Sequence, residues 1–89
     1  MAEDRNLEFL SASLKNFQAR RWEIFGANIT DAIRVTIRVP RASLNTRSSP
    51  AEQAVAIGQD LSRFGWRLTG FAYDQDNLNV DLVHDLMVS

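Results

Sequence analysis

The feature that most constrains the fold is a strict alternation of apolar and polar residues between positions 32 and 39. The apolar members are Ile33, Val35, Ile37 and Val39, and the polar members are Arg34, Thr36 and Arg38. Successive side chains of a strand point to opposite faces of a sheet, so this pattern predicts a strand with one buried face and one open face. Pro40 ends the strand, because proline has no N–H to donate.

The clearest helix begins at Ser49. A hydroxyl at N-cap, Pro50 at N1 and Glu52 at N3 form a capping box, which satisfies backbone donors at the start of the helix. Gly65 ends it. Its expected apolar face consists of Ala51, Ala54, Val55, Ile57, Leu61 and Phe64. Gly58 lies within this face, where it costs helix stability, so we expect a close approach to the sheet there.

The first 25 residues offer two interpretations. Apolar residues at helical spacing predict one helix over 4–25, ended by Gly26: Leu7, Leu10, Leu14, Phe17, Ile24 and Phe25. Two residues fit poorly, because Arg21 falls on the apolar side and Trp22 falls off it. The alternative is a helix that ends near Ala19 and a short strand over 21–25. We expect the long helix.

Two further strands are expected over 66–73 and 78–87, joined by a turn at 74–77. The last strand is apolar on both sides in places, which suits a central position. The predicted fold is a single α+β domain over 1–89, a two-layer sandwich of order α-β-α-β-β. Its three-stranded antiparallel sheet has the split βαβ arrangement, with the last strand central and both helices on one face.

The second strand decides the expected binding surface. Small residues at 70 and 72 would fit beneath Gly58, so Phe71 and Tyr73 should point to the open face with Arg67. The polar side of the first strand and the loop over 41–48 adjoin this face. The expected partner-binding residues are Arg34, Arg38, Arg41, Arg47, Arg67, Phe71 and Tyr73.

A structural interpretation of the same residues stays open. Residues 20–67 carry eight arginines against four acidic residues, and residues 68–89 carry four aspartates and no basic residue. Asp81 and Asp85 could therefore pair across the open face with the arginines of the first two strands, each pair contributing a few tenths of a kcal/mol.

Sequence motifs for chemistry are largely missing. There is no cysteine and no phosphate-binding, zinc-protease or nucleophile-elbow motif. The single histidine, His84, is expected on the buried side of the last strand. The run from Asp74 to Asn79 starts like a calcium loop but lacks its glycine and closing glutamate. We therefore expect no catalytic residue, no metal site, no cofactor and no small-molecule substrate.

The predicted function is that of a non-enzymatic protein-interaction module, an accessory subunit, regulator or inhibitor of a larger complex. Its partner is another protein or a second copy of the chain in a homodimer. The alternative is binding of single-stranded RNA or DNA by the same face, which the four C-terminal aspartates disfavour. No segment resembles a signal peptide or a membrane span, so the expected location is cytoplasmic.

Overall fold

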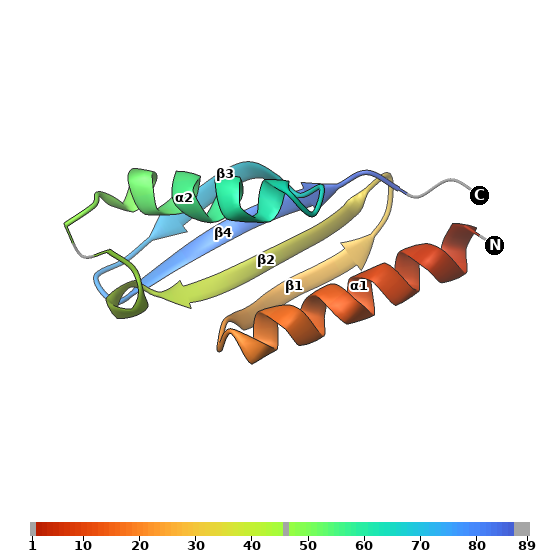
Figure 1. Ribbon diagram of the computed structural model, residues 1–89, viewed down its shortest axis with the longest axis horizontal. Coiled ribbons are helices and arrows are strands. Elements are labelled where there is room, and N and C mark those ends of the chain that lie inside the picture. The colour runs from red at the N-terminus through yellow and green to blue at the C-terminus, as the bar shows by residue number, and fades with distance from the viewer. Residues whose placement is uncertain (1, 46, 87–89) are drawn as a thin grey trace.

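The computed structural model describes residues 2–45 and 47–86, with side chains from Asp4 onward. The elements in chain order are α1 (Ala2–Ala19), β1 (Glu23–Ile29), β2 (Ile33–Pro40), the 3₁₀ turn η1 (Arg41–Ser43), α2 (Pro50–Ser62), β3 (Arg67–Tyr73) and β4 (Asn77–His84). The strands form one antiparallel sheet in the order β1-β2-β4-β3 (Figure 1). Both helices cover the same face of this sheet, α1 over β1 and α2 over β3.

The α+β class is confirmed, but the predicted three-stranded sheet and the order α-β-α-β-β are wrong. The sheet has a fourth strand, β1, where the long-helix interpretation placed the last turns of the first helix. The strand after the hairpin does lie between its two predicted neighbours, since β4 pairs with both β2 and β3. It ends at His84, earlier than predicted, and residue 87 lies outside the described residues.

The first helix ends early because its terminus is a Schellman motif. The Trp22 N–H donates to the Phe17 carbonyl at 3.0 Å, and the Arg21 N–H donates to the Gln18 carbonyl at 2.9 Å. Arg21 takes the left-handed conformation that this motif requires, with φ 65°. The helix therefore ends without the glycine that usually takes this conformation. The alternative of a helix that ends near Ala19 is the correct one.

The core lies between the sheet and the two helices. The alternation in β2 is confirmed: Ile33, Val35, Ile37 and Val39 are all 2% exposed or less. The facing residues of β4 are Leu78, Val80 and Leu82, and the helices add Leu10, Phe17, Ala54, Ile57 and Leu61. Full burial of each large aliphatic side chain stabilises the fold by about 1.5–3 kcal/mol.

The expected face of α2 needs correction at its edges. Val55 is 48% exposed and Phe64 is 47% exposed, and Ala51 is also exposed. The close approach at Gly58 is present, because a Cβ there would stand 3.1 Å from the Leu68 Cβ. Helix α2 therefore contacts β3 through its small residue and leaves Val55 at the outer edge.

The chain consists of two similar α-β-β halves, offset by 44 residues. Trp66 repeats the role of Trp22, since its N–H donates to the Leu61 carbonyl at 3.3 Å, and Gly65 takes the left-handed position of Arg21 with φ 89°. Strand β3 spans the positions of β1 moved by 44. Both edge strands also carry a register shift, between Ile24 and Gly26 in β1 and between Leu68 and Gly70 in β3.

Within the described ranges, neither helix combines the length and the apolar character needed to cross a bilayer.

Candidate binding surfaces

The predicted open face is divided by the bulge in β3. Before the bulge, Arg67 pairs with Val83, and both side chains point to the open face. The register then shifts by one residue, and Phe71 and Tyr73 pair with the buried residues Val80 and Leu78. Both rings therefore lie on the helix side of the sheet, and the prediction that they share the open face with Arg67 is wrong.

The arginines of the open face are held by partners within the chain. Arg34 Nη2 donates to both Asp31 carboxylate oxygens at 3.2 Å, and Arg67 Nη2 donates to Asp85 Oδ1 at 2.7 Å. The alternative that the arginines pair with aspartates within the chain is thus correct for Arg67 and Asp85, while Arg34 pairs with Asp31 instead. The pKa of Asp31 is lowered, first by the hydrogen bond from the Thr30 hydroxyl and then by Arg34.

Arg38 occupies the other end of this face. Its guanidinium carbon lies 3.8 Å from the centre of the Phe25 ring, its Nε donates to Asn79 Oδ1 at 3.3 Å, and Glu23 is 3.8 Å away. The centre of the face is closed by Thr36, whose hydroxyl donates to an Asp81 oxygen at 2.8 Å. Because these polar groups have partners within the chain, this face is polar and largely satisfied. Exposed pairs of this kind contribute only about 0–1 kcal/mol each.

Three of the predicted site residues meet elsewhere, at the outer edge of β3. The rings of Phe71 and Tyr73 are stacked, with centroids 6.4 Å apart, and they are 39% and 58% exposed. The Arg41 guanidinium carbon lies 5.8 Å from the centre of the Tyr73 ring. We refer to Phe71, Tyr73 and Arg41 as the aromatic ridge.

The position of Arg41 in the ridge is fixed by the hairpin between β3 and β4. Its backbone N–H donates to the Asp76 carbonyl and its Nη1 donates to the Asp74 carbonyl, both at 2.9 Å. Arg47, by contrast, is exposed on the loop before α2, and its backbone N–H donates to Asn45 Oδ1. Within residues 2–45 and 47–86, the side chain of Arg47 meets none of the other six predicted site residues.

The apolar surface of the ridge continues along the edge of the sandwich. Val55, Gly58 and Leu68 line a shallow hollow of about 330 Å³ between α2 and β3. Leu68 precedes the ridge on the same strand and lies on the same side of the sheet. The hollow and the ridge therefore lie along the same strand and on the same side of the sheet.

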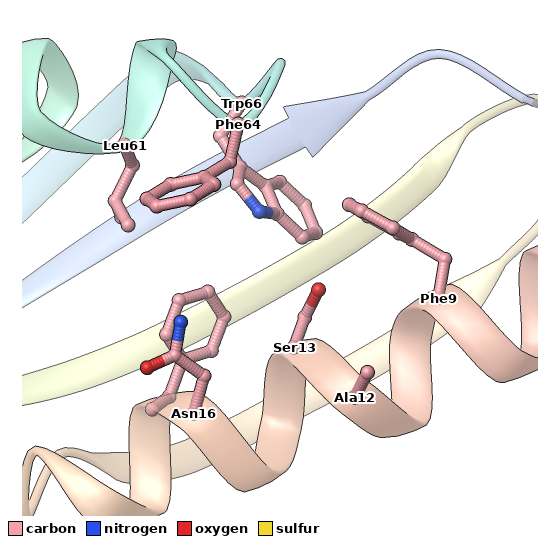
Figure 2. Close-up of a pocket in the computed structure, with 8 residues that line it drawn as sticks. Phe9, Ala12, Ser13, Asn16, Leu61, Phe64 and Trp66 are labelled. Carbon is pink, nitrogen blue, oxygen red and sulfur yellow. The ribbon is translucent and has the colours of Figure 1, made fainter.

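A second hollow, which the sequence did not reveal, lies between the two helices. Figure 2 shows it, with the Trp66 indole nitrogen turned into the space and the Ser13 hydroxyl pointing toward it from α1. Its volume is about 140 Å³. Its walls include Phe9 and Phe17, whose rings lie 5.6 and 5.9 Å from that of Trp66. The rings of Phe9, Phe17 and Trp66 also pack α1 against the second half of the chain.

A third pocket, of about 270 Å³, adjoins the ridge and is polar. It lies between η1, the first turn of α2 and the β3–β4 turn, and it is lined by Arg41, Ala42, Gln53, Gln75 and Asp76. Gln53 is only 3% exposed although it is polar. Gln53 was not among the predicted site residues, because its helical position alone does not show which loop covers it.

The acidic side chains and the single histidine do not gather into a metal site in the described part of the chain. No group of three or more His, Cys, Asp or Glu side chains there could hold a metal ion. His84 packs on Phe9 with ring centroids 4.4 Å apart, and its Nδ1 lies 2.7 Å from the backbone carbonyl of Asp85. Its ring is engaged in packing, as its predicted place on the buried side implies.

Comparison with known proteins gave no match to any family model, curated protein or solved structure.

Proposed function

We propose that this chain is a non-enzymatic domain that binds another protein through the aromatic ridge, as an accessory subunit, regulator or inhibitor of a larger complex. The observation that carries the proposal is the exposed, stacked pair of Phe71 and Tyr73 with Arg41 beside it. Aromatic residues and arginine are enriched where protein interfaces concentrate their binding energy.

The internal repeat supports a role for these rings outside folding. The first half carries Ala27 and Ile29 at the positions of Phe71 and Tyr73, 44 residues earlier. The same strand thus forms with much smaller side chains. The rings are therefore larger than this position of the fold requires.

Size sets a further condition on the interface. A standard interface covers about 800 Å² on each partner. Two partly exposed rings and one arginine supply only the centre of such an area. The hollow lined by Val55 and Leu68 would add to this area, since Leu68 lies on the same strand and the same side of the sheet as the rings.

The test exchanges the ridge for the residues of the first half. A chain with both Phe71→Ala and Tyr73→Ile should keep its fold, because the equivalent strand tolerates both residues. Phe25→Thr is the matched control: Phe25 is 51% exposed on the open face, and threonine is its counterpart in β3. We expect partners captured by the original chain from its native cell to be lost by the ridge variant and kept by Phe25→Thr.

For a purified partner, we expect the ridge variant to bind at least about tenfold more weakly, as loss of a binding hot spot requires. Light scattering at micromolar concentration tests a second copy as the partner, since a ridge-mediated homodimer should become monomeric in the ridge variant. An unchanged set of captured proteins together with an unchanged oligomeric state would refute the proposal.

Single-stranded RNA or DNA is the competing ligand. The arginines of the open face already bind Asp31, Asn79 and Asp85, so few cationic groups there are available for phosphate. Nucleic-acid binding falls steeply with salt. A labelled oligonucleotide that binds at low salt and is released by the ridge substitutions would replace the protein partner in this proposal.

A further inference from the structure

The hollow between the two helices contains a buried hydrogen-bond donor without a partner. Trp66 is only 2% exposed, and Figure 2 shows its indole nitrogen turned into this space. Its indole N–H forms no hydrogen bond with any residue that the structure describes, although a buried tryptophan N–H usually has a partner. The atom is not sealed from solvent, because the fully enclosed, unpartnered polar atoms of the described residues belong to Arg41 and Gln53. A ligand in the hollow can therefore reach it.

The equivalent place in the other half of the fold is closed by the chain itself. Arg20 Nη1 donates to Asp60 Oδ2 at 2.9 Å, which links the end of α1 to α2. The Arg20 guanidinium carbon also lies 5.1 Å from the centre of the Trp22 ring. The offset of 44 residues relates Arg20 to Phe64. It likewise relates Asp60 to Asn16, and both counterparts line the hollow. A phenyl ring and an amide cannot form an ion pair, so the hollow departs from the repeat and lacks the cover that Trp22 has.

The walls of the hollow are aromatic and carry no charge. Of the eight described residues that line it, none is charged and four have aromatic rings: Phe9, Phe17, Phe64 and Trp66. An ion that entered would lose hydration without gaining a partner of opposite charge. A neutral aromatic ring, by contrast, can pack against these rings edge to face or in an offset stack. The walls therefore favour a neutral aromatic ligand.

The volume of the hollow fits a single ring. It is about 140 Å³, and an apolar cavity of about 150 Å³ accepts one molecule of benzene. The indole N–H requires an acceptor, which a hydroxyl or carbonyl oxygen on a substituent of the ring would supply. The Ser13 hydroxyl, which points toward the same space, can bind the same oxygen.

We propose that this hollow binds a small, neutral aromatic molecule of one ring, whose hydroxyl or carbonyl oxygen accepts the hydrogen bond from the Trp66 indole. The site shares no lining residue with the aromatic ridge. It goes beyond the proposed function, because it gives a protein-binding domain a separate site for a small ligand.

The first test uses benzyl alcohol as the probe and the indole N–H signals of the full chain in ¹H–¹⁵N correlation spectra. Trp22→Phe removes one of the two indole signals and so assigns the other to Trp66. We expect a saturable shift of the Trp66 signal. No saturable shift would overturn the proposal and would mean that the hollow holds only water.

Two matched probes separate the oxygen from the ring. Ethylbenzene has the shape of benzyl alcohol without the oxygen. Because both probes place the same ring, the indole proton should lie further downfield with benzyl alcohol than with ethylbenzene. Cyclohexylmethanol keeps the hydroxyl and loses the aromatic ring, so it should bind at least about twofold more weakly. Equal proton shifts at saturation would overturn the role of the N–H as donor, and equal affinity for cyclohexylmethanol would overturn the aromatic class.

Ala12→Leu should block the site, because Ala12 lines the hollow from an exposed position of α1 and leucine is a good helix former. Ala19→Leu is the matched control, since it makes the same change at an exposed position of the same helix outside the hollow. We expect the benzyl alcohol shift to be lost in the first variant and kept in the second. Equal binding by the two variants would overturn the placement of the site.

A second pair of changes closes the hollow in the way that the repeat closes its counterpart. A chain with both Asn16→Asp and Phe64→Arg would carry the ion pair of Asp60 and Arg20 at the related place. We expect it to keep its circular dichroism spectrum and to lose the benzyl alcohol shift. A shift that persists at full size in the folded variant would contradict the proposal.

Discussion

Replacement of Gly65 by alanine should strongly destabilise the protein. Gly65 has φ 89°, a left-handed conformation that costs a residue with a Cβ about 1–2 kcal/mol. The new Cβ would also clash with His84 Nε2 and would stand 2.9 Å from His84 Cδ2. The imidazole has little room to withdraw, because its centroid is 4.4 Å from that of Phe9 and 5.4 Å from that of Trp66.

The magnitude follows from these two effects. Overpacking against a confined ring adds about 1–3 kcal/mol to the backbone strain. The smaller entropy of the unfolded alanine chain returns about 0.4–1 kcal/mol. The net loss of unfolding free energy should therefore be about 1–4.6 kcal/mol. For a chain of this length that loss lowers Tm by at least about 4 °C, at roughly 4–8 °C per kcal/mol.

The assay is urea unfolding followed by circular dichroism, with two comparison variants. Arg21→Gly places glycine at the equivalent left-handed position of the first half, so it should raise stability by roughly 0.5–1 kcal/mol. Gly26→Ala is the unstrained control, because a Cβ there meets no atom within 4 Å, and it should leave stability unchanged or raise it by up to about 1 kcal/mol. A loss below about 1 kcal/mol for Gly65→Ala, or destabilisation by Arg21→Gly, would refute the description of both helix ends.

Two further changes test the second helix and the hairpin. Ser49 Oγ accepts the Glu52 N–H at 3.2 Å, so Ser49→Ala should lower the unfolding free energy by about 1 kcal/mol, whereas Ser48→Ala should leave the urea midpoint almost unchanged. The pKa of Asp74 is lowered because its carboxylate accepts the backbone N–H groups of Asn77 and of the residue before it. A group with a lowered folded-state pKa stabilises the protein above its unfolded pKa, near 3.9, and this contribution is lost as pH falls through the folded value. Asp74→Asn should therefore reduce the acid-induced fall in urea midpoint between about pH 5 and pH 2, and an unchanged fall would contradict the assignment.

The second half of the fold could be predicted from the sequence because the residues that define its elements act locally. The capping box at Ser49, the glycine at the end of the helix and the acidic turn each act within a few residues. The alternation in β2 placed the core correctly for the same reason, since the period of a strand is visible over eight residues. These elements define the sheet centre and the helix above it.

The first half was harder because its helix end lacks the usual residue. Arg21 adopts the conformation that glycine serves at position 65, and the nearest glycine, Gly26, lies inside β1 instead. Comparison of the two halves supplies the missing signal. Trp22 and Trp66 are each followed by an aliphatic residue at the second position and a glycine at the fourth, and only one of the two copies has a clear helix end.

The phase of β3 could not be read from alternation alone. A bulge adds one residue to a strand, and the sequence from Arg67 to Tyr73 alternates without a visible break. The structure reverses the faces after Leu68, which separates Arg67 from the rings of Phe71 and Tyr73. The predicted site residues thus divide into a satisfied polar face and a ridge.

The repeat also separates what the fold needs from what a partner would need. Features present in both halves serve the sandwich: the Schellman motif, the tryptophan that closes it, and the bulge before a glycine. The two rings of the ridge are restricted to the second half, because Ala27 and Ile29 take their positions in the first. Arg41 and Gln53 lie between the two β-hairpins and belong to no repeated feature of the strands. If binding served both halves equally, their edges would carry similar side chains; their difference supports the proposal that the partner binds at the edge of β3.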